Sequence, residues 1–444
     1  MLSAAYLLDR LKPVPRPRRY WVAFSGGVDS SVLLDLVAAA RPALDGAEVH
    51  AVYVDHKLQP VSRSWDAHCR TVCRELQVPY RCLELNLVLA RGHSLEAQAR
   101  EARYQALADV MGEGDVLLTG QHRDDQMETF LLQALRGAGP TGLAAMPAVA
   151  RFGAGSLVRP LLDVDRSQLT EYARQRGLHW VEDASNADVS FDRNYLRHEI
   201  TPRLRERWPA AAKTLARVAR HNADAAALLR EYAREELASL MDSGGRLAVD
   251  RMAGRSVARQ FQLLRVWLEL TGLTCPSERK LRQIVETAIE RGGAGSPRID
   301  WPGGEVRRYG NFLYAARPIC VKPWSSPVQW QNPATGFSLP AGLGTLRLVS
   351  SPAGGLNLDI LGARITIGFR QGGERCRPQV RGSTRPLKKL LQERRVVPWM
   401  RSYMPLLFVD DELAAIGELC DCAPFSAGNG PGLRLEWSNH PPLH

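Results

Sequence analysis

The chain lacks several features that mark common classes of protein. None of its apolar stretches reaches the roughly 20 residues that a membrane-spanning helix requires. Residues 1–20 are rich in Pro and Arg and contain no apolar core followed by a small-residue cleavage site, so we expect no secretory signal. The eight cysteines include no C-x-x-C pair and form no disulfide framework. These absences predict a cytoplasmic protein with reduced thiols and no contact with a membrane.

Lysine is scarce as well, with seven residues among the 58 Lys and Arg, while the net charge is +11. A strongly basic chain usually meets nucleic acid or an anionic membrane surface, although a genome that favours Arg would also raise the charge. The basic residues are clustered, however: residues 193–220 hold eight against two acidic ones, and residues 370–401 hold ten against two. Uniform enrichment does not produce such clusters. They predict salt-dependent contacts with nucleic acid phosphates.

The first half of the chain alternates strand-like and helix-like patterns at about 30 residues per unit. The predicted strands cover residues 20–24, 49–54, 80–85 and 115–119, and the predicted helices cover residues 29–40, 64–76, 94–111 and 124–136. This alternation predicts an α/β domain with a parallel, doubly wound sheet, which binds ligands beyond the carboxyl ends of its strands.

The second half changes character. Long helical patterns cover residues 209–240 and 256–289, Gly, Pro and Trp dominate residues 292–361, and the C-terminal part has one clear helix at 386–394. We therefore predict three domains: a catalytic domain over 1–215, a helical substrate- or tRNA-binding domain with a Pro/Gly-rich linker over 216–350, and a small α+β tRNA-binding domain over 351–444.

A glycine-rich loop follows the first predicted strand, with the sequence Ser25-Gly26-Gly27-Val28-Asp29-Ser30. Glycines there let backbone N–H groups turn toward an anion, and the following helix N-terminus adds free donors. No Gly-Lys-Ser/Thr follows, so this is not a Walker A loop. The loop resembles the pyrophosphate-binding loop of the N-type ATP pyrophosphatases. The resemblance implies ATP cleavage between the α and β phosphates, with Asp29 helping to place Mg²⁺.

An acidic helix start follows the fourth predicted strand. If the helix begins near Asp124, then Asp124 and Glu128 share one face, with Asp125 beside them and His122 just before. Ordinary acidic capping explains one Asp but not the whole group. Binding of magnesium, binding of an amine as its ammonium, and proton uptake all remain open as roles.

Further motifs resemble one family, the bacterial tRNA(Ile)-lysidine synthetases. In the catalytic half they are Val54-Asp55-His56, Leu95-Glu96-Ala97, Ala99 to Tyr104, Arg136 to Gly139, Arg159 to Leu162, Asp183 to Asn186 and Arg193 to Arg197. In the C-terminal part they are Gln371 to Arg375, Leu387 to Leu391 and Pro398 to Arg401. The chain departs from the family pattern at Lys57-Leu58-Gln59, where Gly-Leu-Arg is common, and at Ala184, where Pro is common. These departures weaken any role for residues 57 and 59.

The resemblance implies a ligase that forms a C–N bond. ATP adenylates the C2 oxygen of the wobble cytidine in tRNA(Ile) with a CAU anticodon, and free L-lysine then displaces AMP. The implied catalytic residues are Asp29, Asp124, Asp125 and Glu128. The implied ATP-binding residues are Ser25 to Ser30, His56 and Arg103, with Asp29 and Asp125 as Mg²⁺ ligands. The implied substrate- and tRNA-binding residues are His122, Arg159, Arg193, Asn194, Arg197, Arg375, Lys388 and Lys389. Arg193, Asn194 and Arg197 have a structural alternative, in which they clamp a preceding loop.

Three other functions compete with this one. A tRNA thiolase of the same superfamily would carry a Cys pair, which is absent. A small-molecule amidating or argininosuccinate-type ligase would not need the basic clusters or the C-terminal domain. A catalytically silent tRNA-binding protein would need neither the loop nor the acidic helix. The oligomeric state is left open, with a homodimer as one alternative.

Overall fold

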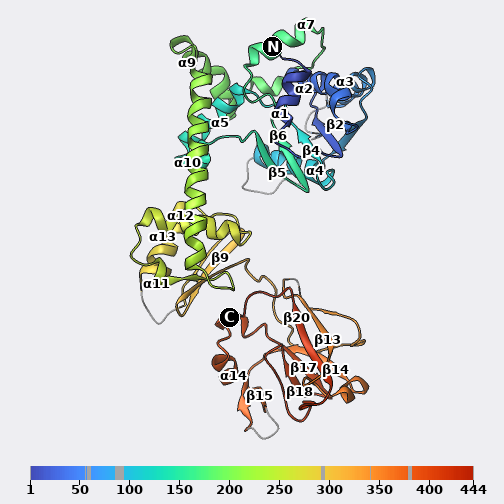
Figure 1. Cartoon of the computed structure of the whole chain (residues 1–444), viewed down its shortest axis with the longest axis vertical. Coiled ribbons are helices and arrows are strands. Elements are labelled where there is room, and N and C mark those ends of the chain that lie inside the picture. The colour runs from blue at the N-terminus through green and yellow to red at the C-terminus, as the bar shows by residue number, and fades with distance from the viewer. Residues whose placement is uncertain are drawn as a thin grey trace. The chain divides into compact units, whose positions relative to one another are not determined.

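A computed structural model describes the chain except for residues 1, 56, 58–61, 86–94, 292–295, 341, 379–382 and 444 (Figure 1). The chain divides into two compact units, Met1–Leu228 and Leu229–His444. The boundaries that we predict at residues 215 and 350 therefore stay a prediction. In the part of the chain that the structure describes, no helix is long and apolar enough to cross a membrane.

The first unit is built on a six-stranded sheet with the order β3-β2-β1-β4-β6-β5. Its strands are β1 (Arg19–Ala23), β2 (Glu48–Asp55), β3 (Tyr80–Glu84), β4 (Val116–Leu118), β5 (Val149–Phe152) and β6 (Gly155–Val158). All neighbours pair in parallel except β5, which runs antiparallel to β6 at the edge. The predicted parallel α/β sheet is confirmed, and the β5–β6 hairpin is an addition that the sequence did not suggest.

Helices cover both faces of this sheet (Figure 1). They are α1 (Ala4–Leu11), α2 (Val28–Ala40), α3 (Ser62–Glu75), α4 (Leu95–Asp109) and α7 (Arg166–Gln175). Two further helices follow β4: α5 (Arg123–Leu135) and α6 (Pro140–Leu143). Alternate residues of β1 face opposite sides: Val22 belongs to the core with α1, α2, α3 and α7, whereas Trp21 belongs to the core with α4. Burial on both faces explains why the strands read as nearly continuous apolar runs.

A helical segment follows the sheet and packs on α5. It consists of α8 (Asp192–Tyr195), a π-helical turn (Leu196–Ile200), α9 (Thr201–Arg207) and α10 (Ala211–Leu240). A small apolar cluster holds it there, in which Met127 and Leu131 of α5 meet Leu204 of α9 and Ala211 of α10. The acidic helix is thus covered by the first basic cluster of the sequence.

The second unit begins within α10, at Leu229. Helices α11 (Val249–Met252), α12 (Val257–Leu270) and α13 (Glu278–Gln283) follow, and α13 continues as a π-helical turn (Ile284–Glu290). The helix that we predict over 256–289 is therefore interrupted, at a segment that contains Gly272 and Pro276. A sheet of order β7-β10-β9-β8 packs with these helices. Its strands are β7 (Leu247–Ala248), β8 (Arg298–Trp301), β9 (Gly304–Tyr309) and β10 (Phe312–Ala316). Part of the expected linker is thus an ordered antiparallel sheet.

The C-terminal part contains small antiparallel sheets around one apolar core. The strands are β11 (Val328–Gln329), β12 (Phe337–Ser338), β13 (Thr345–Ser351), β14 (Ile365–Phe369), β15 (Arg375–Cys376), β16 (Arg385–Pro386), β17 (Pro405–Val409), β18 (Glu412–Ile416), β19 (Cys420–Asp421) and β20 (Gly432–Ser438). The predicted helix is α14 (Leu387–Glu393). The α+β prediction for this part is confirmed.

Candidate active site

The strand order creates a crevice between the loops that follow β1 and β4. From β1 the sheet continues through β2 and β3 on one side and through β4 and β6 on the other. The two loops touch at Gly120, where an added Cβ would lie 3.0 Å from the backbone carbonyl carbon and oxygen of Asp29. A side chain at position 120 would push the loops apart, so this glycine permits their close approach.

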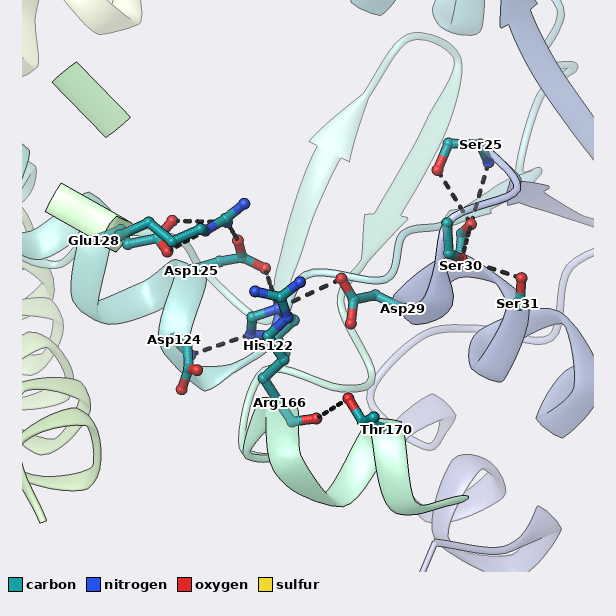
Figure 2. Close-up of polar contacts among 12 residues, drawn as sticks. Ser25, Asp29, Ser30, Ser31, His122, Asp124, Asp125, Glu128, Arg166 and Thr170 are labelled. Carbon is teal, nitrogen blue, oxygen red and sulfur yellow. Dashed lines mark hydrogen bonds and ion pairs between the residues drawn. The ribbon is translucent and has the colours of Figure 1, made fainter. Parts of the chain in front are cut away.

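Hydrogen bonds between Ser25, Ser30 and the backbone hold the loop after β1 in a turn (Figure 2). Gly26 has a φ of +80°, and a Cβ there would also lie 3.0 Å from Cγ2 of Val181. Ser30 Oγ accepts a hydrogen bond from the Ser25 N–H at 3.2 Å and donates to the Gly27 carbonyl at 2.9 Å. Gly27 is the N-cap of α2. The atom nearest to a Cβ added at Gly27 would be Ser25 Oγ, at 3.6 Å, so the protein leaves room for a ligand beside this glycine. Free N–H groups at this helix start favour a phosphate.

His122 links this loop to the acidic helix (Figure 2). It is the N-cap of α5: its Nδ1 accepts from the Asp124 N–H at 3.2 Å, and Asp125 Oδ2 accepts from the His122 N–H at 2.9 Å. On the other edge of the ring, Nε2 lies 3.5 Å from Asp29 Oδ2 and 3.4 Å from Asp125 Oδ2. Burial lowers the pKa of His122, but the hydrogen bond to Asp29 and the charge of Asp125 outweigh it and raise the pKa overall. The imidazole thus lies between two carboxylates from the first turns of different helices, Asp29 of α2 and Asp125 of α5.

Two arginines neutralise the acidic helix. Arg193 donates to Glu128 at 2.8 Å and to Asp125 at 2.7 Å. Arg197 donates to Glu128 at 2.8 and 3.0 Å and to Asp125 at 3.1 Å. Burial raises the pKa of Asp125, but the charges of His122 and Arg193 more than offset that and leave the pKa below its usual value. Nη1 of each arginine has no hydrogen bond to a described residue, which leaves in-plane N–H donors of each guanidinium for a ligand.

The loops and the arginines surround a pocket of about 800 Å³. Nine of the residues that we predict from sequence line it: Ser25, Gly27, Asp29, Ser30, Arg103, Asp125, Arg193, Asn194 and Arg197. A recess of about 260 Å³ adjoins the pocket and shares Ser25, Gly27 and Arg103 with it. Its walls also include the apolar residues Phe24, Val52, Val54, Trp65, Leu107 and Val181, and the polar residues Asp183 and Asn186. The site therefore combines an anion-binding loop, cationic walls and a recess with both apolar and polar walls.

Comparison with known proteins identifies the family. Three family models match in order: the PP-loop domain over 3–204, the TilS substrate binding domain over 247–314 and the TilS substrate C-terminal domain over 365–437. The tRNA(Ile)-lysidine synthase of Alkalilimnicola ehrlichii is 41% identical over 99% of this chain and 98% of its own length. The chain belongs to the tRNA(Ile)-lysidine synthase family.

Other synthases of the family show the same extent of similarity. Those of Coxiella burnetii and Methylococcus capsulatus are 37% and 41% identical, over 95% and 90% of this chain and 93% and 91% of their own lengths. Among solved structures, the U34-tRNA thiolase NcsA from Methanococcus maripaludis is 14% identical over 49% of this chain and 77% of its own, with a TM-score of 0.42.

Several residues that the family resemblance implied do not line the pocket. His122, Asp124 and Glu128 are buried, at 2, 5 and 1% exposure, and Asp124 pairs with Arg205 at 2.5 Å. Arg159 is also buried, and its Nη1 donates to the Pro147 carbonyl at 2.8 Å. Gly26 and Val28 are absent from the walls too. His56 lies outside the described residues, and Arg375, Lys388 and Lys389 belong to the second unit.

Several further wall residues were not assigned a role from the sequence. Five of them lie in the motifs that carry the family resemblance: Asp55, Arg100, Tyr104, Asp183 and Asn186. Sequence reasoning gave no other sign of Tyr53, Trp65, Gln121, Asp188 and Phe191. Lys57 has a φ of +52°, which suits glycine, and its Nζ lies 2.7 Å from Glu84 Oε2. The sequence did carry a sign of this residue, because Gly is common in the family at this position. A glycine there suits the positive φ that the backbone adopts at the pocket wall.

One carboxylate of the pocket fits Mg²⁺. Within the described ranges, no group of three or more His, Cys, Asp or Glu side chains is arranged to hold a metal ion. Asp29 Oδ1, however, is buried without a hydrogen-bond partner. Mg²⁺ commonly binds through one or two carboxylates together with substrate phosphates and water, so Asp29 beside the phosphate loop fits this mode. Both oxygens of Asp125 already accept hydrogen bonds, from His122, Arg193 and Arg197.

Proposed function

We propose that this chain uses ATP to attach free L-lysine to C2 of the wobble cytidine in tRNA(Ile) with a CAU anticodon. The main evidence is the similarity to tRNA(Ile)-lysidine synthases over nearly the whole chain. The pocket supports it, because a phosphate loop, buried carboxylates and two arginines with unpaired N–H donors meet there. The reaction forms a C–N bond and releases AMP and pyrophosphate.

ATP is proposed to lie along the loop after β1. Its adenine suits the recess, where Trp65 and Leu107 offer apolar contacts and Asp183 and Asn186 offer polar ones, and its β and γ phosphates suit the N–H groups at the start of α2. Arg103 lines both cavities and has no acidic partner among the described residues. Burial disfavours the charged guanidinium and so lowers its pKa. A bound anion beside Arg103 would compensate for this cost. Residues 25–30 and Arg103 are therefore our proposed nucleotide-binding residues.

In the first step, the C2 oxygen of cytidine attacks the α phosphorus, and the bond to the β-phosphate oxygen breaks. Pyrophosphate leaves with the electron pair and stays held by the loop. Mg²⁺, when bound at Asp29, would neutralise charge on the phosphate oxygens. The unpaired N–H donors of Arg193 and Arg197 are proposed to stabilise the negative charge that develops at the α phosphate.

In the second step, the neutral ε-amine of lysine attacks C2, the C2–O bond breaks and AMP leaves. The amine loses a proton to a carboxylate or to water, which completes lysidine. Asp125 reaches the pocket wall and remains a proposed catalytic residue and metal ligand, which requires release of part of its ion pairs. For Asp124 and Glu128, the contacts described above favour positioning of arginines instead of direct contact with substrate.

The remaining proposed contacts involve tRNA. Arg193, Asn194 and Arg197 lie at the pocket, and Arg375, Lys388 and Lys389 in the second unit would bind tRNA phosphates there. For His122 and Arg159, burial favours a supporting role. A cytoplasmic location and a homodimer are further parts of the proposal.

The test is incorporation of labelled lysine into a tRNA(Ile) transcript with a CAU anticodon, in the presence of ATP and Mg²⁺. We expect label in this tRNA and none in a methionine tRNA. Asp29→Ala should reduce incorporation at least 100-fold, because the phosphate-side carboxylate is lost, and should leave tRNA affinity within about twofold. Asp192→Ala, an exposed Asp outside the pocket lining, is the matched control and should remain active.

Two results would contradict the proposal. Pyrophosphate release that depends on tRNA, without lysine incorporation, would retain base adenylation and reject lysine as the nucleophile. Binding of tRNA without either product would indicate a silent binding protein.

A further inference from the structure

Trp208 stands out on the surface of the first unit, since 59% of it is exposed. A single exposed apolar residue is ordinary. This one, however, sits on a fixed backbone at the end of α9: its N–H donates to the Leu204 carbonyl at 2.8 Å, and its carbonyl accepts from the Ala211 N–H at 2.9 Å. The indole is thus presented to solvent at a sharp, hydrogen-bonded corner between α9 and α10.

Cations without acidic partners flank this corner. Arg203 and Arg207 lie one turn apart on α9, and Lys213 and Arg217 lie one turn apart on α10. All four are exposed, and none forms an ion pair with a described residue. Between residues 203 and 217 the single acidic residue is Glu206. An exposed aromatic ring among unpaired cations is the combination that binds single-stranded nucleic acid, where the ring stacks on a base and the cations meet phosphates.

The corner packs directly against the acidic helix, α5. Leu204 and Ala211, on either side of Trp208, pack against Met127 and Leu131 of α5. On the same side Arg205 pairs with Asp124 at 2.5 Å. Any RNA held at Trp208 is therefore held at a fixed position relative to the acidic helix, and α5, α9 and α10 are neighbours in Figure 1.

A second exposed aromatic residue provides a contrast within the chain. Tyr232, on α10, is 65% exposed. The neighbouring Arg230 and Arg234 both pair with Glu269, at 3.1 and 3.3 Å, and Glu231 and Glu235 are exposed beside it. Exposure of an aromatic ring is thus shared by both sites, whereas unpaired positive charge is found only at Trp208.

We propose that Trp208 is a nucleobase-stacking platform for the anticodon arm of the tRNA substrate, with Arg203, Arg207, Lys213 and Arg217 as its phosphate contacts. The inference rests on the proposed function, because that function brings a wobble base to the pocket beside α5. Trp208 is a positioning residue: it holds the arm so that the wobble base can leave its stack and enter the pocket.

The experiment compares Trp208→Ala, Trp208→Phe and Tyr232→Ala in the full chain. Equilibrium binding would be measured with a tRNA(Ile) transcript and with its isolated anticodon stem-loop. We expect Trp208→Ala to weaken both affinities about 5- to 100-fold, the effect of losing one base–aromatic stack. Trp208→Phe keeps an aromatic face and should stay within about threefold of the wild type. Tyr232→Ala should stay within about twofold.

Three readouts separate a stacking platform from a structural role and from a protein interface. The thermal midpoint of Trp208→Ala should match that of the wild type, since the side chain is exposed. Unchanged RNA affinity in Trp208→Ala, with a wild type that binds tRNA, would overturn the stacking platform and leave the proposed function intact. A wild type that binds no tRNA would overturn both. A change in sedimentation without a change in RNA affinity would assign Trp208 to a protein interface and also refute the proposal.

Discussion

Residues 193–220 and residues 370–401 carry similar excesses of basic over acidic side chains, yet the structure uses these charges differently. In the first cluster Arg193, Arg197 and Arg205 face the buried carboxylates of α5. In the second, Lys388 and Lys389 are exposed on α14 and pair with no described acidic residue. A count of charges therefore predicts a binding surface only after the charges that are neutralised inside the protein have been subtracted.

The source of the difference is the partner element. The first cluster lies against a helix that brings Asp124, Asp125 and Glu128. Among its described residues, the second cluster forms ion pairs only with its own acids, Arg370–Glu374 at 3.6 Å and Arg385–Glu393 at 3.3 Å. Part of the first cluster is therefore a structural element of the active site, whereas most of the described cations of the second form no ion pair and are available to an anionic partner.

The largest expected effect is a loss of stability when a buried carboxylate that pairs with the first cluster is removed. Glu128→Ala removes the carboxylate that Arg193 and Arg197 share and leaves two cations facing one remaining Asp. Removing one partner of a buried ion pair costs about 3–5 kcal/mol, and we expect the lower end because both arginines are about a quarter exposed. Urea denaturation would measure the loss, and hydrogen exchange in α5 and α8 would locate it.

The control for this prediction is Glu278→Ala, which breaks an exposed pair with Arg282 at 3.1 Å. Exposed pairs contribute about 0–1 kcal/mol, so this variant should unfold almost like the wild type. Equal losses in the two variants would mean that the α5 network adds no more stability than a surface pair.

The next effect concerns binding and tests the exposed cluster. Replacing Lys388 and Lys389 together by Glu should leave the unfolding midpoint unchanged and weaken tRNA binding about tenfold or more at moderate salt. The slope of log affinity against log salt should fall by about two, since each lost phosphate contact removes about one counterion. Filter binding between 50 and 200 mM salt would measure both quantities.

Lys12→Glu makes the same kind of charge change at a lysine that already pairs with Asp9 at 2.8 Å. Its salt slope should equal that of the wild type. A slope that is unchanged in the double variant would show that the second cluster, despite its exposure, does not contact tRNA phosphates.

The sequence predicted the parts of the fold that depend on local patterns. The four strands β1 to β4 and the helices α2 to α5 lie within a few residues of their expected positions, because apolar strand runs alternate there with amphipathic or Ala-rich helices. The β5–β6 hairpin was missed because Val149–Phe152 and Gly155–Val158 are short and contain Ala, Gly and Ser, which have little strand preference.

At the site, the sequence identified the loop and the acidic helix but not how the charges pair. Arg193 and Glu128 are 65 residues apart, and Arg205 and Asp124 are 81 apart. Such partners are set by how α8 and α9 fold back on α5, which no local pattern records. The same long-range packing buries Glu128 and pairs it with Arg193 and Arg197 at the pocket wall, and its catalytic role stays a prediction.

The smallest expected effect is a change of stability with pH that comes from the paired carboxylate of Asp125. Since the folded pKa of Asp125 lies below the unfolded value of 3.8, its ionised form stabilises the protein above that pH. This contribution is lost as the pH falls through the folded pKa. Because one group exchanges at most one proton, the slope cannot exceed about 1.4 kcal/mol per pH unit.

The measurement is the difference in unfolding free energy between the wild type and Asp125→Asn, in urea, from pH 5 down to pH 3, without ATP or Mg²⁺. We expect this difference to shrink as the pH falls, because protonation makes the wild-type side chain neutral like that of Asn. The matched variant Asp192→Asn alters an exposed Asp that lies 3.8 Å from Arg136, and its difference from the wild type should stay constant. A constant difference for Asp125 as well would show that its carboxylate gains nothing from Arg193 and Arg197. The ion pairs of Arg193 and Arg197 with Asp125 would then add no stability, and only their geometry would distinguish the first basic cluster from the second.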